Sequence, residues 1–417
     1  MTSLSRRRLL GVGGAAAGVV VAGGLAGGAI AAAAGDDGSD QRGPASVVSF
    51  RGEHQAGIVT PVQDRLLFAS FDLTSSERSD VVSLMRRWTA AADRLTRGEP
   101  VAGSAISDQS PPDDTGEATG LAASRLTLTF GFGSSLFSTG GTDRYGVTSK
   151  RPAPLIDLPA FPRDNLNATR SGGDMCVQAC GDDPQVLFHA IRNLARIGRG
   201  TVRLRWSQEG FGRTSSTGTG QSTARNLMGF KDGTNNLRSG SAELDPSVWV
   251  TRGDDPSWMV GGSYLVVRRI RIRIEIWDRS SLVDQEDTIG RVRATGAPPG
   301  RHSEFDAIDL AAKDADGALE IPEKAHVRLA NQKANDIHIL RRGYNFTDGL
   351  DPAVGQLDAG LFFLAYQRDT RQQFVPLQNK LAQGDALNEY IEHVASAHFA
   401  IPPGVGPGEW IGGTLLG

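Results

Sequence analysis

Cysteine is scarce in this sequence, and neither sign of charge is in excess. The 417 residues include two cysteines and carry a formal net charge of −3. This balance argues against the basic surface that a nucleic-acid-binding protein presents to phosphates, so we expect no nucleic-acid partner. With 39% hydrophobic and 22% charged residues, the composition is that of an ordinary globular protein long enough for two domains.

The two cysteines do not predict a disulfide. Cys176 and Cys180 both lie in the run 175–180, which has the apolar character of a strand. Residues four apart on a strand share a face but are separated by roughly 13 Å, which is too far for a disulfide. We therefore expect two buried free thiols.

The N-terminus has the pattern of an export signal. Residues 6–8 are all arginine, and the weakly apolar stretch after them ends in four alanines at 31–34. Paired arginines before such a stretch indicate a twin-arginine signal peptide over 1–34. The small alanines at its end suit cleavage by a signal peptidase. The alternative is an uncleaved membrane anchor, because the stretch is long enough to span a bilayer. We expect the twin-arginine machinery to export the folded protein to the periplasm, cell envelope or medium, and a disordered linker over 35–46.

In the first half of the chain after the predicted linker, the sequence predicts several strands and one helix. Residues 126–133, 175–180 and 202–206 have the apolar or alternating character of strands. Asp183 followed by Pro184 marks the start of a helix.

The second half repeats this plan. Residues 263–277 alternate as a strand with one wet face, and a buried strand over 361–366 is followed by an acidic turn and a helix through 374–381. A shift of 186 residues superposes four identical residues, namely Ala179 on Ala365, Asp183 on Asp369, Phe188 on Phe374 and Asn193 on Asn379. We expect a duplicated α+β fold of antiparallel sheets with helices on one face. Its domains would be 47–215 and 216–417, with a flexible junction near 210–222.

Three short motifs carry candidate functional side chains. Residues 229–234 (Gly-Phe-Lys-Asp-Gly-Thr) place Asp232 on a sharp bend, although a β-turn is also the ordinary position of an aspartate. His326 begins His-Val-Arg-Leu-Ala-Asn, where a core histidine is the alternative. Arg341 lies in Leu-Arg-Arg-Gly-Tyr-Asn (340–345), where surface or interface charge is the alternative.

In this order, the three motifs resemble the signature of the dye-decolourising peroxidases. The chain looks most like the exported branch described as deferrochelatase/peroxidase. Further matching segments extend the resemblance from about residue 47 to the end, at 54–61, 131–133, 173–178, 285–286 and 289–291. One departure is Gln332, which follows Asn331 where the family pattern has proline. The resemblance implies duplicated ferredoxin-like domains of the dimeric α+β barrel type.

The resemblance also implies a haem and its proximal ligand. His326 would bind the haem iron through one ring nitrogen, and Asp336 is our candidate acceptor for the proton on the other nitrogen. His338 could compete as a ligand but lacks the motif. No Cys-x-x-Cys-His motif occurs, so the cofactor would be non-covalent haem b.

On the other face of the haem, the resemblance implies a catalytic pair. Asp232 and Arg341 would assist hydrogen peroxide, and Arg341, Gly233 and Thr234 would also contact the cofactor. Peroxide must lose a proton from one oxygen and gain one on the other, which suits a carboxylate base beside a permanent cation. The resulting ferryl haem would oxidise organic donors such as dyes or phenols.

Two other functions share the same pocket. A deferrochelatase-type protein would bind haem and release its iron to iron-uptake partners. A haem-free relative used for binding is less compatible with His326 and Arg341 together. The sequence leaves the oligomeric state open, with a homo-oligomer among the alternatives.

Overall fold

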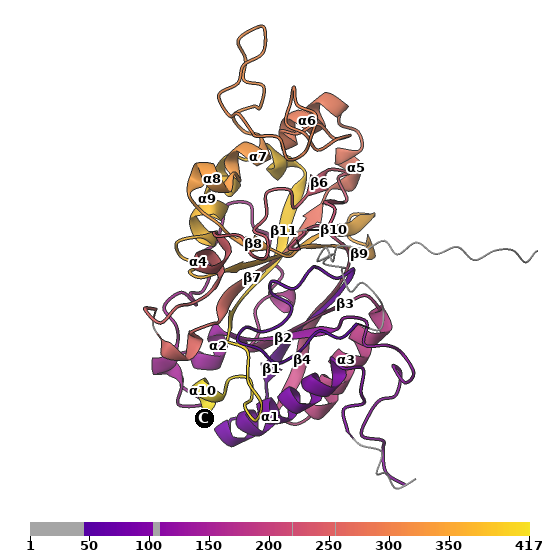
Figure 1. The fold of residues 1–417 in the computed structure, drawn as a ribbon, viewed down its shortest axis with the longest axis vertical. Helices are drawn as coiled ribbons and strands as arrows, with labels where there is room; N and C mark the ends of the chain where they lie inside the picture. The colour runs from indigo at the N-terminus through magenta and orange to yellow at the C-terminus, as the bar shows by residue number, and fades with distance from the viewer. Residues whose placement is uncertain (1–45, 103–108, 219, 255) are drawn as a thin grey trace, which may run out of the picture. The chain divides into compact units, whose positions relative to one another are not determined.

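The computed structural model of the protein describes residues 46–102, 109–218, 220–254 and 256–417 (Figure 1). The predicted signal peptide, 1–34, and residues 35–45 of the predicted linker lie outside these residues. Within the described part of the chain, no helix combines the length and apolar character needed to cross a membrane.

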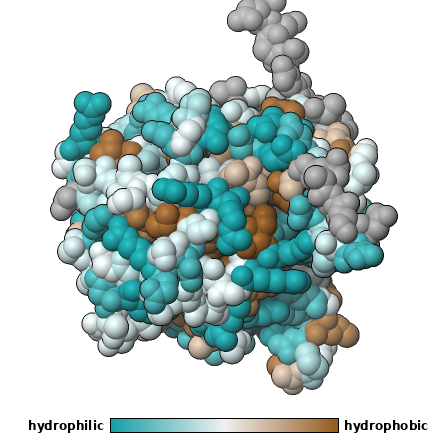
Figure 2. All heavy atoms as spheres, turned by 90° about the horizontal axis from the view of Figure 1, so that it is seen from below, coloured by the Kyte–Doolittle hydropathy of each residue, from teal (hydrophilic) through white to brown (hydrophobic). Residues whose placement is uncertain are grey.

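The first half of the chain contributes four antiparallel strands in the order β2-β3-β1-β4. They are β1 (Arg65–Leu73), β2 (Thr127–Gly133), β3 (Met175–Gly181) and β4 (Val202–Arg213). Helices α1 (Arg78–Leu95) and α3 (Pro184–Ile197) cover one face of these strands (Figure 1). As predicted, Asp183 caps α3 by accepting hydrogen bonds from the backbone of Gln185 and Val186. The surface at this end of the molecule is mainly hydrophilic (Figure 2), because the apolar sides of both helices pack inward.

The second half repeats this topology. Its strands are β7 (Ser263–Ile272), β9 (Tyr344–Asp351), β10 (Gln356–Gln367) and β11 (Ile391–Ile401), in the order β11-β7-β10-β9. In each half the fourth strand pairs with the first, the first with the third, and the third with the second. This shared order confirms the predicted duplication of an antiparallel α+β unit, while the domain boundary at 215 and 216 stays a prediction.

Two seams join the half-sheets into a closed ring. Strand β11 pairs with β2 at Phe399 and Gly133, and β4 pairs with β9 at Phe211 and Asn345. The short strand β8 (Leu340–Arg341) adds to β10. A hydrophobic core that includes the rings of Phe68, Phe362 and Phe399 forms where the strands meet.

The remaining elements are short and connect or flank the strands. The helices are α2 (Ser134–Phe137), α4 (Leu244–Val248), α5 (Ile274–Trp277), α6 (Leu282–Ile289), α7 (His326–Leu329), α8 (Gln332–Asn335), α9 (Phe374–Gly384) and α10 (Gly413–Leu416). The 3-10 helices are η1 (Thr148–Lys150), η2 (Ala168–Arg170), η3 (Ser257–Met259) and η4 (Ala386–Glu389). Strands β5 (Ala224–Arg225) and β6 (Lys231–Asp232) form a separate small ladder.

The prediction for residues 263–277 is wrong in two respects. Strand β7 ends at Ile272, and residues 274–277 form helix α5. The predicted wet face is not open to solvent, because the side chain of Arg271 is 12% exposed and pairs with Asp351 of β9. Arg268 and Arg269 are only 1% and 4% exposed. Arg268 pairs with Asp164, and Arg269 pairs with Asp348 and Asp358.

The junction near 210–222 also differs from the flexible segment that its composition predicts. Strand β4 continues to Arg213, and residues 214–217 are buried. Thr214 donates its backbone N–H to the Gly343 carbonyl, and Ser215 Oγ accepts from the Gly343 N–H. The start of the junction is therefore fixed beside Arg341.

The prediction of two free thiols is confirmed. Cys176 and Cys180 are both buried on β3 and form no disulfide. Burial raises the pKa of the Cys176 thiol well above its usual value.

A buried histidine on β11 predicts a loss of stability in mild acid. His398 contacts Thr370 Oγ1 and the Ile156 carbonyl, and burial lowers its pKa from 6.5 to about 4. The unfolded chain binds a proton below pH 6.5, but the folded chain does not until about pH 4. The stability that neutral His398 confers is thus complete above pH 6.5 and lost as the pH falls to about 4.

We expect His398→Gln to flatten this decline by up to about 1.4 kcal/mol per pH unit. Urea unfolding at several pH values between 7 and 4.5 measures the slope, and His302→Gln on an exposed loop is the control. Equal slopes in the His398 variant and the parent would contradict the assignment.

Candidate active site

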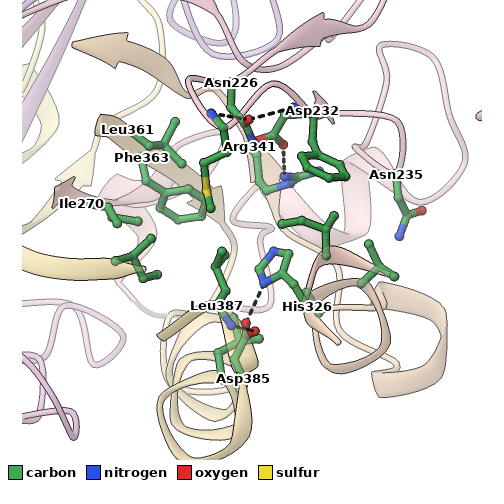
Figure 3. A pocket seen from close by; sticks show the side chains of 18 of the residues that line it. Asn226, Asp232, Asn235, Ile270, His326, Arg341, Leu361, Phe363, Asp385 and Leu387 are labelled. Atoms are coloured by element: carbon green, nitrogen blue, oxygen red, sulfur yellow. Dashed lines mark hydrogen bonds and ion pairs between the residues drawn. The ribbon is translucent and has the colours of Figure 1, made fainter. Parts of the chain in front are cut away.

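A cavity in the second half of the chain collects the predicted site residues. It is lined by apolar side chains from β7, β10, β11 and α9, and by polar side chains from the segment after Phe230. His326, Asp232, Gly233, Thr234 and Arg341 all line it. Figure 3 shows His326 on one side of the cavity and the Asp232–Arg341 pair on the opposite side.

His326 is the first residue of the short helix α7. Its Nδ1 lies 2.6 Å from Oδ2 of Asp385, whose side chain is 3% exposed. Burial alone would lower the pKa of His326, but the neighbouring Asp385 carboxylate outweighs burial and raises the pKa. With Nδ1 held by Asp385, Nε2 is the ring nitrogen that remains for a metal.

The partner of His326 is not the one predicted. We expected Asp336, but it is exposed and ends α8 in the left-handed conformation, at φ 52°. Asp385 lies 59 residues beyond His326 in the chain and reaches it through the turn between α9 and η4. Its other oxygen accepts the Leu387 backbone N–H at 2.9 Å, which fixes the carboxylate. His338 does not line the cavity.

The opposite side of the cavity holds an ion pair. Arg341 Nη1 donates to Asp232 Oδ1 at 2.8 Å, and Asn226 Nδ2 lies 3.5 Å from Asp232 Oδ2. The backbone N–H and carbonyl of Arg341 both bond to the Asn236 side-chain amide, each at 2.8 Å. The Asn236 contacts fix the backbone of Arg341, and the Asp232 contact fixes its guanidinium. Among the described residues, Asp232 Oδ2 has only the long contact from Asn226.

The bend after Asp232 depends on glycine. Gly233 has a φ of +100°, and a Cβ there would lie 3.0 Å from the Ser215 backbone. The next residue, Thr234, donates its hydroxyl to Glu304 Oε2 at 2.8 Å. Glu304 also pairs with Lys231 at 2.7 Å, so the loop is held on both sides of Asp232.

Gln332, the departure from the family pattern, connects two walls of the cavity. Its Nε2 donates to the Asn235 carbonyl at 2.9 Å, and its Oε1 accepts the Ile339 N–H at 3.2 Å. Sequence reasoning missed the roles of Asp385, Asn236, Glu304 and Gln332, because each acts on a residue distant in the chain and no local motif marks it.

The lining fits an iron porphyrin. Ile270, Leu361 and Phe363 give an apolar wall for a flat ring system (Figure 3). A histidine with one nitrogen oriented by a buried carboxylate is the usual form of a metal-binding imidazole. The fit rests on these side chains together, because no single one of them is specific for a porphyrin.

The Asp385 contact leads to a prediction about haem affinity. Asp385→Asn keeps an oxygen for the Leu387 N–H but removes the charge, so the imidazole becomes a poorer donor. We expect haem affinity to fall about 10- to 100-fold, measured by titration of the apoprotein with haem. Asp336→Asn, at the residue first predicted for this role, is the matched control. A larger effect from the control would contradict the assignment.

Comparisons with known proteins find matches over both halves of the chain. Residues 55–212 match the family model for the Dyp-type peroxidase N-terminal part, and residues 223–406 match that for the C-terminal part. The chain is 37% identical over 375 residues to Deferrochelatase from Escherichia coli (strain K12), covering 88% of this chain and 86% of the relative.

Two solved structures resemble this chain in both sequence and fold. Ferric DtpA from Streptomyces lividans is 41% identical, with a TM-score of 0.82 over 89% of this chain and 98% of that chain. A DyP-type peroxidase from Streptomyces coelicolor is 40% identical, also with a TM-score of 0.82, over 89% and 98% of the two chains. The protein therefore belongs to the Dyp-type peroxidase family and is a haem peroxidase with the duplicated α+β fold of that family.

Proposed function

We propose that His326 binds the haem iron and that Asp232 and Arg341 act on hydrogen peroxide from the opposite side of the cavity. The observation that carries this proposal is the placement of these three side chains around one apolar cavity. Bound haem supplies the iron that accepts the oxidising equivalents of peroxide.

The two residues of the ion pair have different tasks in this proposal. Asp232 Oδ2, to which Asn226 donates a long hydrogen bond, takes a proton from one peroxide oxygen and returns it to the other. Arg341 cannot act as a base, so it stabilises the negative charge that develops as the O–O bond breaks. Gly233 and Thr234 keep the backbone beside Asp232 in place.

His326 and Asp385 hold the other side. Asp385 accepts the Nδ1 proton and keeps Nε2 directed at the cavity. Organic donors such as dyes or phenols then restore the resting enzyme by supplying two electrons in total, which replace the two that the enzyme gave to peroxide. The apolar walls exclude water from the reacting oxygens.

Turnover of a dye tests this function. With hydrogen peroxide and an anthraquinone dye, the haem-loaded enzyme should decolourise many equivalents of dye at a steady rate. The expected optimum is mildly acidic, since the proton acceptor is a carboxylate. A rate no greater than that of free haem would overturn the proposal.

A second candidate function is iron release from haem, because relatives at 37% identity carry the name Deferrochelatase. The same cavity would then hold haem while its iron leaves for iron-uptake partners. Metal-free protoporphyrin has a characteristic fluorescence, so its appearance in mixtures of protein, haem and an iron chelator would favour this function. Dye turnover without protoporphyrin would favour the peroxidase.

We also propose that the twin-arginine machinery exports the protein to the periplasm, cell envelope or medium. Arginines 6–8 and the apolar stretch that ends at residue 34 support this location.

A further inference from the structure

The long segment between α6 and α7, drawn in orange at the top of Figure 1, carries one buried acid. In the described segment 301–310, Glu304 is the one buried side chain, at 8% exposed, and Phe305 beside it is exposed. A carboxylate that leaves water is stable only where protein donors replace the lost hydration. The donors to Glu304 therefore identify the part of the protein that this segment is attached to.

These donors lie on both sides of Asp232. Lys231 Nζ donates to Glu304 Oε1 at 2.7 Å, and Thr234 Oγ1 donates to Oε2 at 2.8 Å. The small β5–β6 ladder ends at Asp232, before the bend at Gly233. The Thr234 contact thus holds the chain where the ladder has stopped, and the two carboxylate oxygens of Glu304 span the bend.

Glu304 is itself held in place. Its backbone carbonyl accepts Nη1 of Arg291 at 2.9 Å, and the buried Arg291 lines the cavity. Ile308 of the same segment also lines the cavity. Burial alone would raise the pKa of the Glu304 carboxylate, but the hydrogen bond from Lys231 and those from neighbouring hydroxyls outweigh burial and lower the pKa. Glu304 is therefore a fixed, ionised acceptor at neutral pH.

The position of Lys231 explains why its charge needs a partner. Lys231, Arg291 and Arg341 line the cavity together with Asp232. An ammonium released from Glu304 would lie one residue from Asp232 and would compete with Arg341 for its carboxylate. It would then occupy Asp232 Oδ2, the oxygen that receives the peroxide proton in the proposed function. Because Glu304 holds the ammonium, Oδ2 stays available.

We propose that Glu304 is a positioning residue for Asp232. By binding Thr234 it fixes the bend that presents Asp232 to the cavity, and by binding Lys231 it keeps the ammonium from pairing with Asp232. This inference rests on the proposed function, because it takes Asp232 to be the base for peroxide. Glu304 does not line the cavity, so its effect on the reaction must pass through Asp232.

A double-mutant comparison tests this route. In the haem-loaded enzyme, Glu304→Ala should slow the reaction with hydrogen peroxide about 10- to 100-fold, with the Soret band and haem content of the parent. In a variant that already carries Asp232→Asn, adding Glu304→Ala should change the rate by less than about twofold, because the group it positions is gone. An equal fold loss in the two backgrounds would overturn the proposal.

Two further variants separate the two contacts. Adding Lys231→Met to Glu304→Ala should recover part of the lost rate, because the competing ammonium is removed. Without any recovery, the claim that Glu304 restrains Lys231 is wrong. Thr234→Val keeps the volume but loses the hydroxyl, so it should slow the reaction several-fold; a parental rate would overturn the claim that Glu304 fixes the bend.

Hydrogen exchange gives a readout that does not depend on turnover. In the haem-loaded enzyme without peroxide, amides in residues 229–236 should exchange faster in Glu304→Ala than in the parent, while those of the buried strand at 361–366 should not change. Glu304→Gln, which keeps a side-chain oxygen as an acceptor, should lose less rate and less protection. Circular dichroism checks folding, and Glu323→Ala, at an exposed acid of the same segment, is the matched control and should behave as the parent.

The outcomes separate the two proposals. A parental rate in Asp232→Asn alone would overturn the proposed function. A slow Asp232→Asn together with a parental rate and parental exchange in Glu304→Ala would overturn only the positioning role of Glu304.

Discussion

His326→Ala should yield a folded protein that no longer binds haem, with the Soret absorbance reduced at least tenfold after equal exposure to the cofactor. His326 presents its free nitrogen to the cavity because Asp385 holds the other one at 2.6 Å. The bond between iron and imidazole is the only covalent link expected between protein and cofactor. Without that bond, ring contacts with the apolar walls remain but iron-specific affinity is lost.

The control for this variant is His338→Ala. His338 lies twelve residues further along and outside the cavity lining, so its loss should leave the Soret band intact. Metal-free protoporphyrin should still bind to His326→Ala, since it makes no axial bond. An undiminished Soret band in His326→Ala would remove this residue from the ligand role.

Arg341→Leu should keep its haem and react with hydrogen peroxide about 10²- to 10³-fold more slowly. The guanidinium donates to Asp232 at 2.8 Å, and its backbone is fixed by Asn236. Leucine preserves much of the volume but removes the charge that stabilises the breaking O–O bond. Stopped-flow absorbance after mixing with peroxide measures the rate, and the resting Soret band measures haem content.

Arg301→Leu is the matched control for the loss of an arginine. Arg301 is exposed and does not line the cavity, so its variant should react at the parental rate. A parental rate in Arg341→Leu would show that peroxide cleavage does not depend on this cation. Loss of haem from Arg341→Leu would instead assign the residue to cofactor binding.

Local patterns predicted much of this molecule. The Asp183 cap, the buried strand at 361–366 and the shift of 186 residues between the halves all correspond to observed elements. The duplication was visible because both halves keep the same strand order, which preserves the strand, acidic turn and helix at equal spacing. The family resemblance that the motifs around Asp232, His326 and Arg341 carry predicted a shared site, and the structure places these three residues around one cavity.

The failures share one physical cause, which is contact between distant segments. The alternation in 263–277 predicted a wet strand face, but Asp351, 80 residues further along the chain, pairs with Arg271 on that face and covers it. Asp336 was predicted because it is near His326 in sequence, and nothing in the sequence pointed to Asp385. No local pattern could show that the turn after α9 returns to α7.

The two seams of the closed ring have a consequence for assembly. The first half taken alone would expose the edges of β2 and β4, and the second half taken alone would expose the edges of β11 and β9. In the whole chain β2 pairs with β11 and β4 pairs with β9. A backbone cut between β4 and β5 would leave two complementary fragments that need each other to cover those edges. Such a pair would make a split reporter, in which cofactor colour returns only when the fragments meet.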